Sequence, residues 1–266
     1  KEKIPGARFI AGGTDLMVHI RRQEVKCPAL ISLRSLPGLS SIEVKSGARI
    51  GACATITDII EHGALGKAYP LLAEAALRLG SIQIRNAATI GGNICNCSPA
   101  ADMALPLLVY EAEVVLRRAE GERKISLTEF FREPGQSLLA GDEILTEIIL
   151  SPPPGRVKTI FLKKGRVHMD LALASAALLL IVEGEVCKKA RIAAGSVAPV
   201  PLRLRKVEEL LEGAVVDENL ILEARRTAEE SISPITDVRA SADYRRQIFG
   251  VLIERGLKHL LARSKR

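Results

Sequence analysis

The residues best suited to binding chemistry lie in one polar stretch, Gln83 to Asp102, between two apolar runs. Its centre is Gly91-Gly92, flanked by Thr89 and Asn93. Backbone that must approach a ligand closely uses glycine, and exposed N–H groups beside small polar side chains can cradle an anion such as a pyrophosphate. Asp102 could accept hydrogen bonds from a sugar hydroxyl. Taken alone, the stretch also fits an ordinary Gly-Gly turn before a Ser-Pro break.

A second stretch, Phe9 to Leu16, places Gly12-Gly13-Thr14-Asp15 after a short apolar run. Two such loops in one domain could wrap opposite sides of one diphosphate. The pattern predicts a strand over 7–11, a helix beginning at Asp15 and a second strand over 30–33. That βαβ-like unit puts the loop at the carboxyl end of a strand, where open α/β sheets bind ligands. The third glycine of a Rossmann fingerprint is missing, so a nucleotide would need another loop geometry.

With both loops in view, the sequence strongly resembles the FAD-binding (medium) subunits of the molybdenum hydroxylases, the family of carbon monoxide dehydrogenase and xanthine dehydrogenase. The resemblance spans nearly the whole chain, and several motifs in this order are far more specific than one Gly-Gly pair. The motifs that carry it are Ala11 to Leu16, Gln83 to Asn86, Thr89 to Asn93, Ser98 to Asp102, Phe161 to Lys163, Met169 to Ala172, Gly195 to Pro199 and Asp237 to Arg245.

The resemblance implies an α+β fold. An FAD-binding domain of the PCMH (vanillyl-alcohol-oxidase-like) type, in two α/β subdomains, would be followed by a C-terminal antiparallel sheet with helices. We expect the first domain over residues 1–154 and the second over 155–266. The run Pro152-Pro153-Pro154-Gly155 supports this boundary, because prolines remove backbone donors and favour an extended spacer.

The resemblance also implies where FAD would bind. The first loop would wrap the pyrophosphate with Ala11, Gly12, Gly13, Thr14, Asp15 and Leu16. The second would complete the cradle with Thr89, Gly92 and Asn93, and Asp102 would take a sugar hydroxyl. Leu79 and Leu145 fall where the family places apolar contacts to the flavin or adenine. Lys163 falls where a basic side chain could stabilise negative charge on the reduced flavin. By pattern alone these three also fit two core leucines and an ordinary Lys-Lys pair.

In this family a molybdopterin-containing large subunit oxidises substrate, and a small subunit passes electrons through two [2Fe–2S] clusters. The medium subunit then hands them from FAD to an acceptor such as NAD or a quinone. The resemblance therefore implies both partners, assembled as a dimer of heterotrimers. The chain carries neither the flanking domains of the fused eukaryotic enzymes nor the cysteine-rich insertion of the hydroxybenzoyl-CoA reductase branch. Covalent flavin attachment is not expected, since His19 is the only histidine near either loop.

Composition excludes several other functions. A net charge of +7 invites a nucleic-acid partner, but the basic residues are scattered and the chain has no Trp, 3 Tyr and 5 Phe for base stacking. No apolar run is long enough to span a membrane, since 171–182 ends at a Glu-Gly-Glu turn. With no signal-peptide pattern, we expect a cytoplasmic protein.

Metal binding is not expected either. The five cysteines are odd in number and irregularly spaced, which predicts free thiols, and Cys95-Asn96-Cys97 has no second pair to complete a four-ligand site. None of the four histidines pairs with another ligand at helical spacing; they are His19, His62, His168 and His259.

No catalytic nucleophile or acid–base pair stands out, which fits an enzyme whose cofactor performs the chemistry. Two alternatives stay open: a free-standing FAD-dependent oxidoreductase of the same fold, and an assembly subunit that has lost its cofactor. The first would need a substrate domain with an acid–base residue, and the chain after Pro154 offers mainly apolar strands and helices. Retention of both glycine loops and Asp102 speaks against the second.

The remaining elements follow from periodicity. We expect a hairpin over 42–51, helices over 57–61 and 70–79, strands or apolar packing over 105–110, 112–116 and 124–126, a short helix over 127–131 and a strand over 144–150. The C-terminal part predicts strands over 158–163, 172–182 and 186–197, then helices over 206–212, 219–231 and 242–262.

Overall fold

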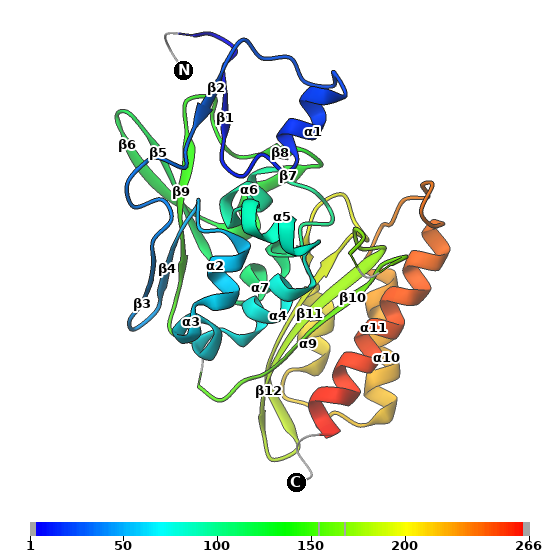
Figure 1. The fold of residues 1–266 in the computed structure, drawn as a ribbon. Coiled ribbons are helices and arrows are strands. Elements are labelled where there is room, and N and C mark those ends of the chain that lie inside the picture. Colours follow the sequence, from blue (N-terminus) through cyan, green and yellow to red (C-terminus); the bar gives the residue numbers. More distant parts are fainter. Residues whose placement is uncertain (1–3, 154, 168, 263–266) are drawn as a thin grey trace.

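The N-terminal lobe has the predicted βαβ order. The computed structural model describes residues 4–153, 155–167 and 169–262. Strands β1 (Arg8–Ile10) and β2 (Leu30–Ser32) pair in parallel, and helix α1 (Leu16–Arg21) lies between them in the chain. Figure 1 shows this lobe at one end of the molecule. The first glycine loop therefore leaves the carboxyl end of β1, as predicted.

A five-stranded antiparallel sheet, in the order β3-β4-β9-β5-β6, forms the next layer. Its strands are β3 (Ile42–Val44), β4 (Ala48–Gly51), β5 (Glu113–Arg118), β6 (Gly121–Ser126) and β9 (Ile144–Leu150). The helices beside it are α2 (Ile56–Glu61), α3 (Gly63–Ala68), α4 (Pro70–Arg78), α5 (Ile82–Ala87), α6 (Ile90–Cys95) and α7 (Ala104–Val109). Helix α8 (Leu127–Phe130) leads into the small pair β7 (Phe131–Glu133) and β8 (Gln136–Ser137).

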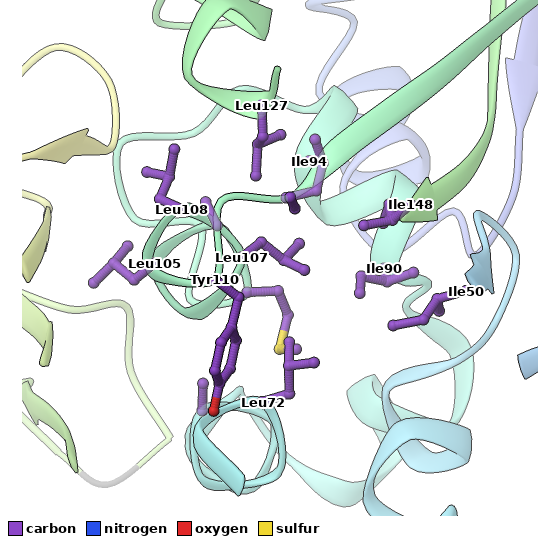
Figure 2. Close-up of a cluster of buried hydrophobic side chains, with 14 of the residues drawn as sticks. Ile50, Leu72, Ile90, Ile94, Leu105, Leu107, Leu108, Tyr110, Leu127 and Ile148 are labelled. Carbon is purple, nitrogen blue, oxygen red and sulfur yellow. The ribbon is translucent and has the colours of Figure 1, made fainter. Parts of the chain in front are cut away.

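The core of this layer lies between the sheet and its helices. Figure 2 shows Ile90 and Ile94 of α6 beside Ile50 of β4 and Ile148 of β9, with Leu107 of α7 turned toward them. All five are fully buried. Because the helix that carries Gly91-Gly92 contributes to this core, it is held firmly against the sheet.

Two local predictions are wrong. The strand expected over 105–110 is instead helix α7 with its C-cap at Tyr110. The pattern misled because a helix buried on every side lacks the polar face that reveals helical periodicity. The stretch 83–102 is not one open loop, since α5 and α6 occupy most of its first half. The glycine pair lies inside α6, whose start is set by the hydroxyl of Thr89 accepting a hydrogen bond from the Gly92 amide.

The C-terminal part is an antiparallel sheet covered on both faces. Its strands, in spatial order, are β10 (Lys158–Lys164), β11 (Ala174–Glu183), β12 (Val186–Gly195) and β13 (Leu202–Arg203). Helices α9 (Arg205–Leu211) and α11 (Ala242–Ala262) pack on one face, with α10 (Glu218–Glu230) beside them, and α4 and α7 pack on the other (Figure 1). Ala177 and Leu179 of β11 join the first core, whereas Leu178 and Leu180 join the second.

This architecture confirms the α+β fold with a C-terminal antiparallel sheet. The predicted domain boundary at Pro154 lies outside the described residues, so the division at that residue stays a prediction. Among the helices of the described segments, none is long and apolar enough to cross a membrane.

Leu178→Ala should test the double burial of β11. Leu178 is fully buried and lies against Gly256 of α11, so truncation should lower the free energy of unfolding by about 2–5 kcal/mol. Leu77→Ala is the matched control, because Leu77 is 53% exposed and should change stability by at most about 0.5 kcal/mol. Urea unfolding followed by circular dichroism measures both; equal effects would contradict the packing described.

Candidate functional site

One large cleft lies where the N-terminal lobe, helices α4 to α6 and the start of the C-terminal sheet meet. It encloses about 780 Å³, within the range of cofactor sites. Both glycine segments line it, together with Asp102 and Lys163. The cleft therefore draws its walls from segments far apart in the sequence.

The first glycine loop presents a row of backbone donors to the cleft. Within the described chain, the amides of Gly12, Gly13, Thr14 and Asp15 donate no hydrogen bond to another protein group. Gly12, Gly13 and Thr14 are partly exposed and Asp15 is exposed, so water or a ligand can reach these residues, and their consecutive amides form a concavity of positive partial charge. This loop can bind an anionic group without any charged side chain.

Close backbone approach fixes the first loop against the second segment. A Cβ atom on Gly12 would lie 2.1 Å from the carbonyl oxygen of Ala87, far inside any permitted contact. Only glycine allows the N-terminal lobe to come this near to the end of α5. The two segments thus line the same cleft because position 12 has no side chain.

The second segment is anchored from behind. The amides of Ile90 and Gly91 donate to the carbonyls of Ala54 and Ala52, and a Cβ on Gly91 would lie 2.6 Å from that of Ala52. Gly91 therefore serves the packing of α6, while Gly92 and Asn93 line the cleft. The side-chain oxygen of Asn93 accepts from the Met103 amide at 3.2 Å, which leaves its NH₂ group to donate toward a ligand.

Asp102 and Lys163 form a buried ion pair within the cleft wall. The Nζ of Lys163 donates to Asp102 Oδ2 at 2.6 Å and to the carbonyl of Arg78 at 3.1 Å. The Asp102 and Lys163 side chains are 5% and 6% exposed, so each charge is stabilised by the other side chain and not by water. Burial raises the pKa of Asp102, and the ammonium of Lys163 lowers it only in part. The other carboxylate oxygen, Oδ1, is buried and has no partner in the described chain.

All the predicted site residues line this cleft except Leu145. Leu145 lies on β9, 3% exposed, opposite Leu116 of β5 in the core, so the structure does not bring it to the cleft. Leu79 lines the cleft at the end of α4. Lys163, predicted as a basic group beside the flavin, lines the cleft and is the ion-pair partner of Asp102.

Sequence reasoning gave no site role to several other lining residues. Arg8 lines the cleft from β1, Ile84 from α5, and Met169, Asp170 and Leu171 from the turn between β10 and β11. The motif Met169 to Ala172 was the one available signal for that turn. The motif Gln83 to Asn86 contains Ile84, but nothing local marks Arg8, because its position depends on how separate elements pack.

Covalent or metal chemistry gains no support at the cleft. Cys95 lines it, but burial raises the pKa of its thiol to about 12, so it stays protonated and weakly nucleophilic. His19 is not among the lining residues and contacts Glu24. Among the described residues, which leave out His168, no three His, Cys, Asp or Glu side chains gather as a metal site.

These features fit FAD. A pyrophosphate needs backbone donors, which Gly12 to Asp15 supply, and sugar hydroxyls need acceptors, which the free Oδ1 of Asp102 supplies. The side-chain amide of Asn93 adds one more donor to the lining. The volume admits one extended dinucleotide, not merely a small anion.

Comparison with known families agrees with this geometry. Residues 1–153 match the model described as the FAD binding domain in molybdopterin dehydrogenase, and residues 160–260 match the CO dehydrogenase flavoprotein C-terminal domain.

Individual relatives match over almost their full length. The chain is 30% identical to the glyceraldehyde dehydrogenase medium chain of Sulfolobus acidocaldarius, covering 95% of this chain and 90% of that one. It is 28% identical to the xanthine dehydrogenase FAD-binding subunit of Escherichia coli O157:H7, covering 97% and 90%. The structure of carbon monoxide dehydrogenase from Hydrogenophaga pseudoflava superposes with a TM-score of 0.94 at 30% identity, covering 97% and 91%.

Gly12→Ala should weaken FAD binding by forcing the two glycine segments apart. The overlap with the Ala87 carbonyl should cost about 1–3 kcal/mol, expressed as lower FAD affinity and lower stability. Gly63→Ala is the control, since a Cβ there meets nothing within 4 Å and the position does not line the cleft. Titration of each purified full chain with FAD, followed by flavin fluorescence, measures the effect; undiminished affinity in Gly12→Ala would contradict it.

Asp102→Asn should destabilise the fold as well as the cofactor site. It leaves the buried ammonium of Lys163 without a countercharge, which costs about 3–5 kcal/mol. The double variant Asp102→Asn/Lys163→Gln should recover most of the stability but not the FAD affinity. Glu43→Gln, which breaks an exposed pair with Lys45, should change stability little. Urea unfolding and FAD titration measure these effects; a fully stable Asp102→Asn would show that the pair contributes nothing.

Proposed function

The chain belongs to the FAD-binding medium subunits of the molybdenum hydroxylases, and we propose that it carries electrons from the iron–sulfur clusters of a partner subunit, through FAD, to an external acceptor. It is thus the flavoprotein subunit of a multi-subunit dehydrogenase. Within the proposal, residues 1–154 form the FAD domain, residues 155–266 form the C-terminal domain, and the complex is cytoplasmic.

The observation that carries the proposal is the row of unpaired amides at Gly12 to Asp15, in the cleft that Gly92 and Asn93 also line. The amides would bind the pyrophosphate, and the NH₂ of Asn93 would add a donor. Asp102 would accept from a sugar hydroxyl through Oδ1 while Oδ2 holds Lys163 in place. Bound FAD supplies the ability to accept electrons one or two at a time; the protein residues bind and orient it.

Leu79 and Lys163 keep proposed roles beside the cofactor, because both line the cleft. Leu79 would exclude water from an aromatic ring system, and Lys163 would place a positive charge near it. Leu145 would act through the core beneath the cleft, since it lies on β9 without reaching the lining.

The partners in this proposal are a molybdopterin-containing large subunit and a [2Fe–2S] small subunit, in a dimer of heterotrimers. Relatives named as medium chains, such as that of glyceraldehyde dehydrogenase, support a heteromeric assembly. The acceptor would be NAD, a quinone or another oxidant.

A free-standing oxidoreductase would need an acid–base group free to act on substrate. Of the carboxylates that line the cleft, Asp102 is buried and neutralised by Lys163 at 2.6 Å, Asp170 pairs with Arg166 at 2.7 Å, and Asp15 lies in the loop of unpaired amides. Holding an oriented cofactor is therefore the role that the pair of Asp102 and Lys163 fits better.

The full chain reconstituted with FAD should show flavin absorbance and pass electrons from a reductant to a dye at best. It should not oxidise aldehydes, purines or carbon monoxide, because it supplies neither a molybdenum centre nor a free acid–base pair. The complex with its partner subunits, assayed on its own substrate, is the positive control. Absence of flavin uptake would favour a subunit that has lost its cofactor, and substrate oxidation by the metal-free chain would favour the free-standing enzyme.

A further inference from the structure

The C-terminal motif Asp237 to Arg245 does not line the cleft, yet it contains a fully buried arginine. Arg245 is 1% exposed, at the start of α11. A guanidinium cannot be deprotonated in a protein, so burying it is costly unless its donors are used. The groups that accept hydrogen bonds from Arg245 therefore indicate why this side chain is buried.

Three hydrogen bonds hold the guanidinium of Arg245. Nη1 donates to the carbonyls of Leu173 at 2.8 Å and Ser196 at 3.3 Å, and Nη2 donates to Asp237 Oδ1 at 2.8 Å. Burial of Asp237 is outweighed by hydrogen bonds from Arg239 and Arg245, which hold the pKa of that carboxyl below its usual range. The carboxylate is thus a permanent countercharge for Arg245.

The two carbonyls belong to residues whose amides hydrogen-bond to the segments that carry the cleft ion pair. The amide of Leu173 donates at 2.7 Å to the carbonyl of Lys164, the residue after Lys163. The amide of Ser196 donates at 2.7 Å to the carbonyl of Pro99, three residues before Asp102. Arg245 therefore links, through two successive hydrogen bonds on each side, the backbone that carries the ammonium and the backbone that carries the carboxylate.

The Ser196 connection needs an unusual backbone. Ser196 has φ +63, a left-handed conformation that a residue with a side chain adopts at a cost. Its buried hydroxyl and Nε of Arg245 have no partner in the described chain. A group kept only for packing would not require this strain together with unpaired polar atoms, so the arrangement is set by the two carbonyl contacts.

We infer that Arg245, held by Asp237, is a positioning residue: it fixes the backbone segments of Asp102 and Lys163 relative to each other, so that the pair is placed for FAD binding. This inference rests on the proposed function, in which the cleft holds FAD. It also assigns a role to the Gly195–Pro199 and Asp237–Arg245 motifs, neither of which lines the cleft.

A double-mutant cycle on FAD affinity tests the inference. Full chains carrying wild-type sequence, Arg245→Lys, Asp102→Asn and both changes are titrated with FAD, and the visible circular dichroism of bound flavin is recorded. Lysine keeps the positive charge, but its single nitrogen lacks the planar fork by which Nη1 holds both carbonyls while Nη2 holds Asp237. Arg245→Lys should weaken FAD binding by about tenfold in the wild-type background and by less than about twofold in the Asp102→Asn background. Its flavin dichroism should also change.

Two further variants separate positioning from general stability. Arg225→Met breaks one ion pair within α10, to Glu229, and one between α10 and α11, to Glu254. It touches no hydrogen bond of Arg245 and should leave FAD affinity and flavin dichroism unchanged. Asp237→Asn keeps a side-chain oxygen that can accept from Arg245 Nη2 but removes the countercharge, and it should lower FAD affinity in the same direction, even if Arg245→Lys folds poorly.

The outcomes are distinct. Failure of the wild-type chain to bind FAD would contradict both the proposed function and this inference. Tight FAD binding by the wild type, with additive effects in the cycle or unchanged affinity in Asp237→Asn, would overturn only the role of Arg245.

Discussion

The ion pair between Asp102 and Lys163 is the contact on which the cleft depends. It joins the segment after α6 to strand β10, so it connects the FAD-binding part to the C-terminal sheet. Separating two buried charges costs several kcal/mol, and the pair therefore allows one relative placement of these segments. The C-terminal part contributes few lining residues but determines the shape of the site.

The C-terminal sheet can hold that placement because both of its faces are buried. Lys163 on β10 lies opposite Ser175 on β11, and this face of β11 continues through Ala177 and Leu179 into the first core. The alternate residues, such as Leu178, pack under the C-terminal helices. Strands with two apolar faces appear in sequence as continuous apolar runs, which is the pattern of 172–182.

Local patterns predicted most elements, with instructive exceptions. Helix α11 has the predicted bounds 242–262, and the hairpin of β3 and β4 follows from its Ser-Gly turn. Helix α7 was missed because every residue in it is buried, which removes the polar face. The Gly91-Gly92 pair predicted a loop, but the Thr89 cap and packing on Ala52 outweigh the low helix propensity of glycine.

The sequence by itself determined the family, the cofactor and the residue types at the cradle, because glycine loops and an acidic side chain carry their chemistry locally. Only the tertiary structure decided that Asp102 meets Lys163, 61 residues further along, and that Leu145 stays in the core. No local pattern encodes such pairings. They arise where two separately folded layers pack, and the cost of an unpaired buried charge then selects the partner.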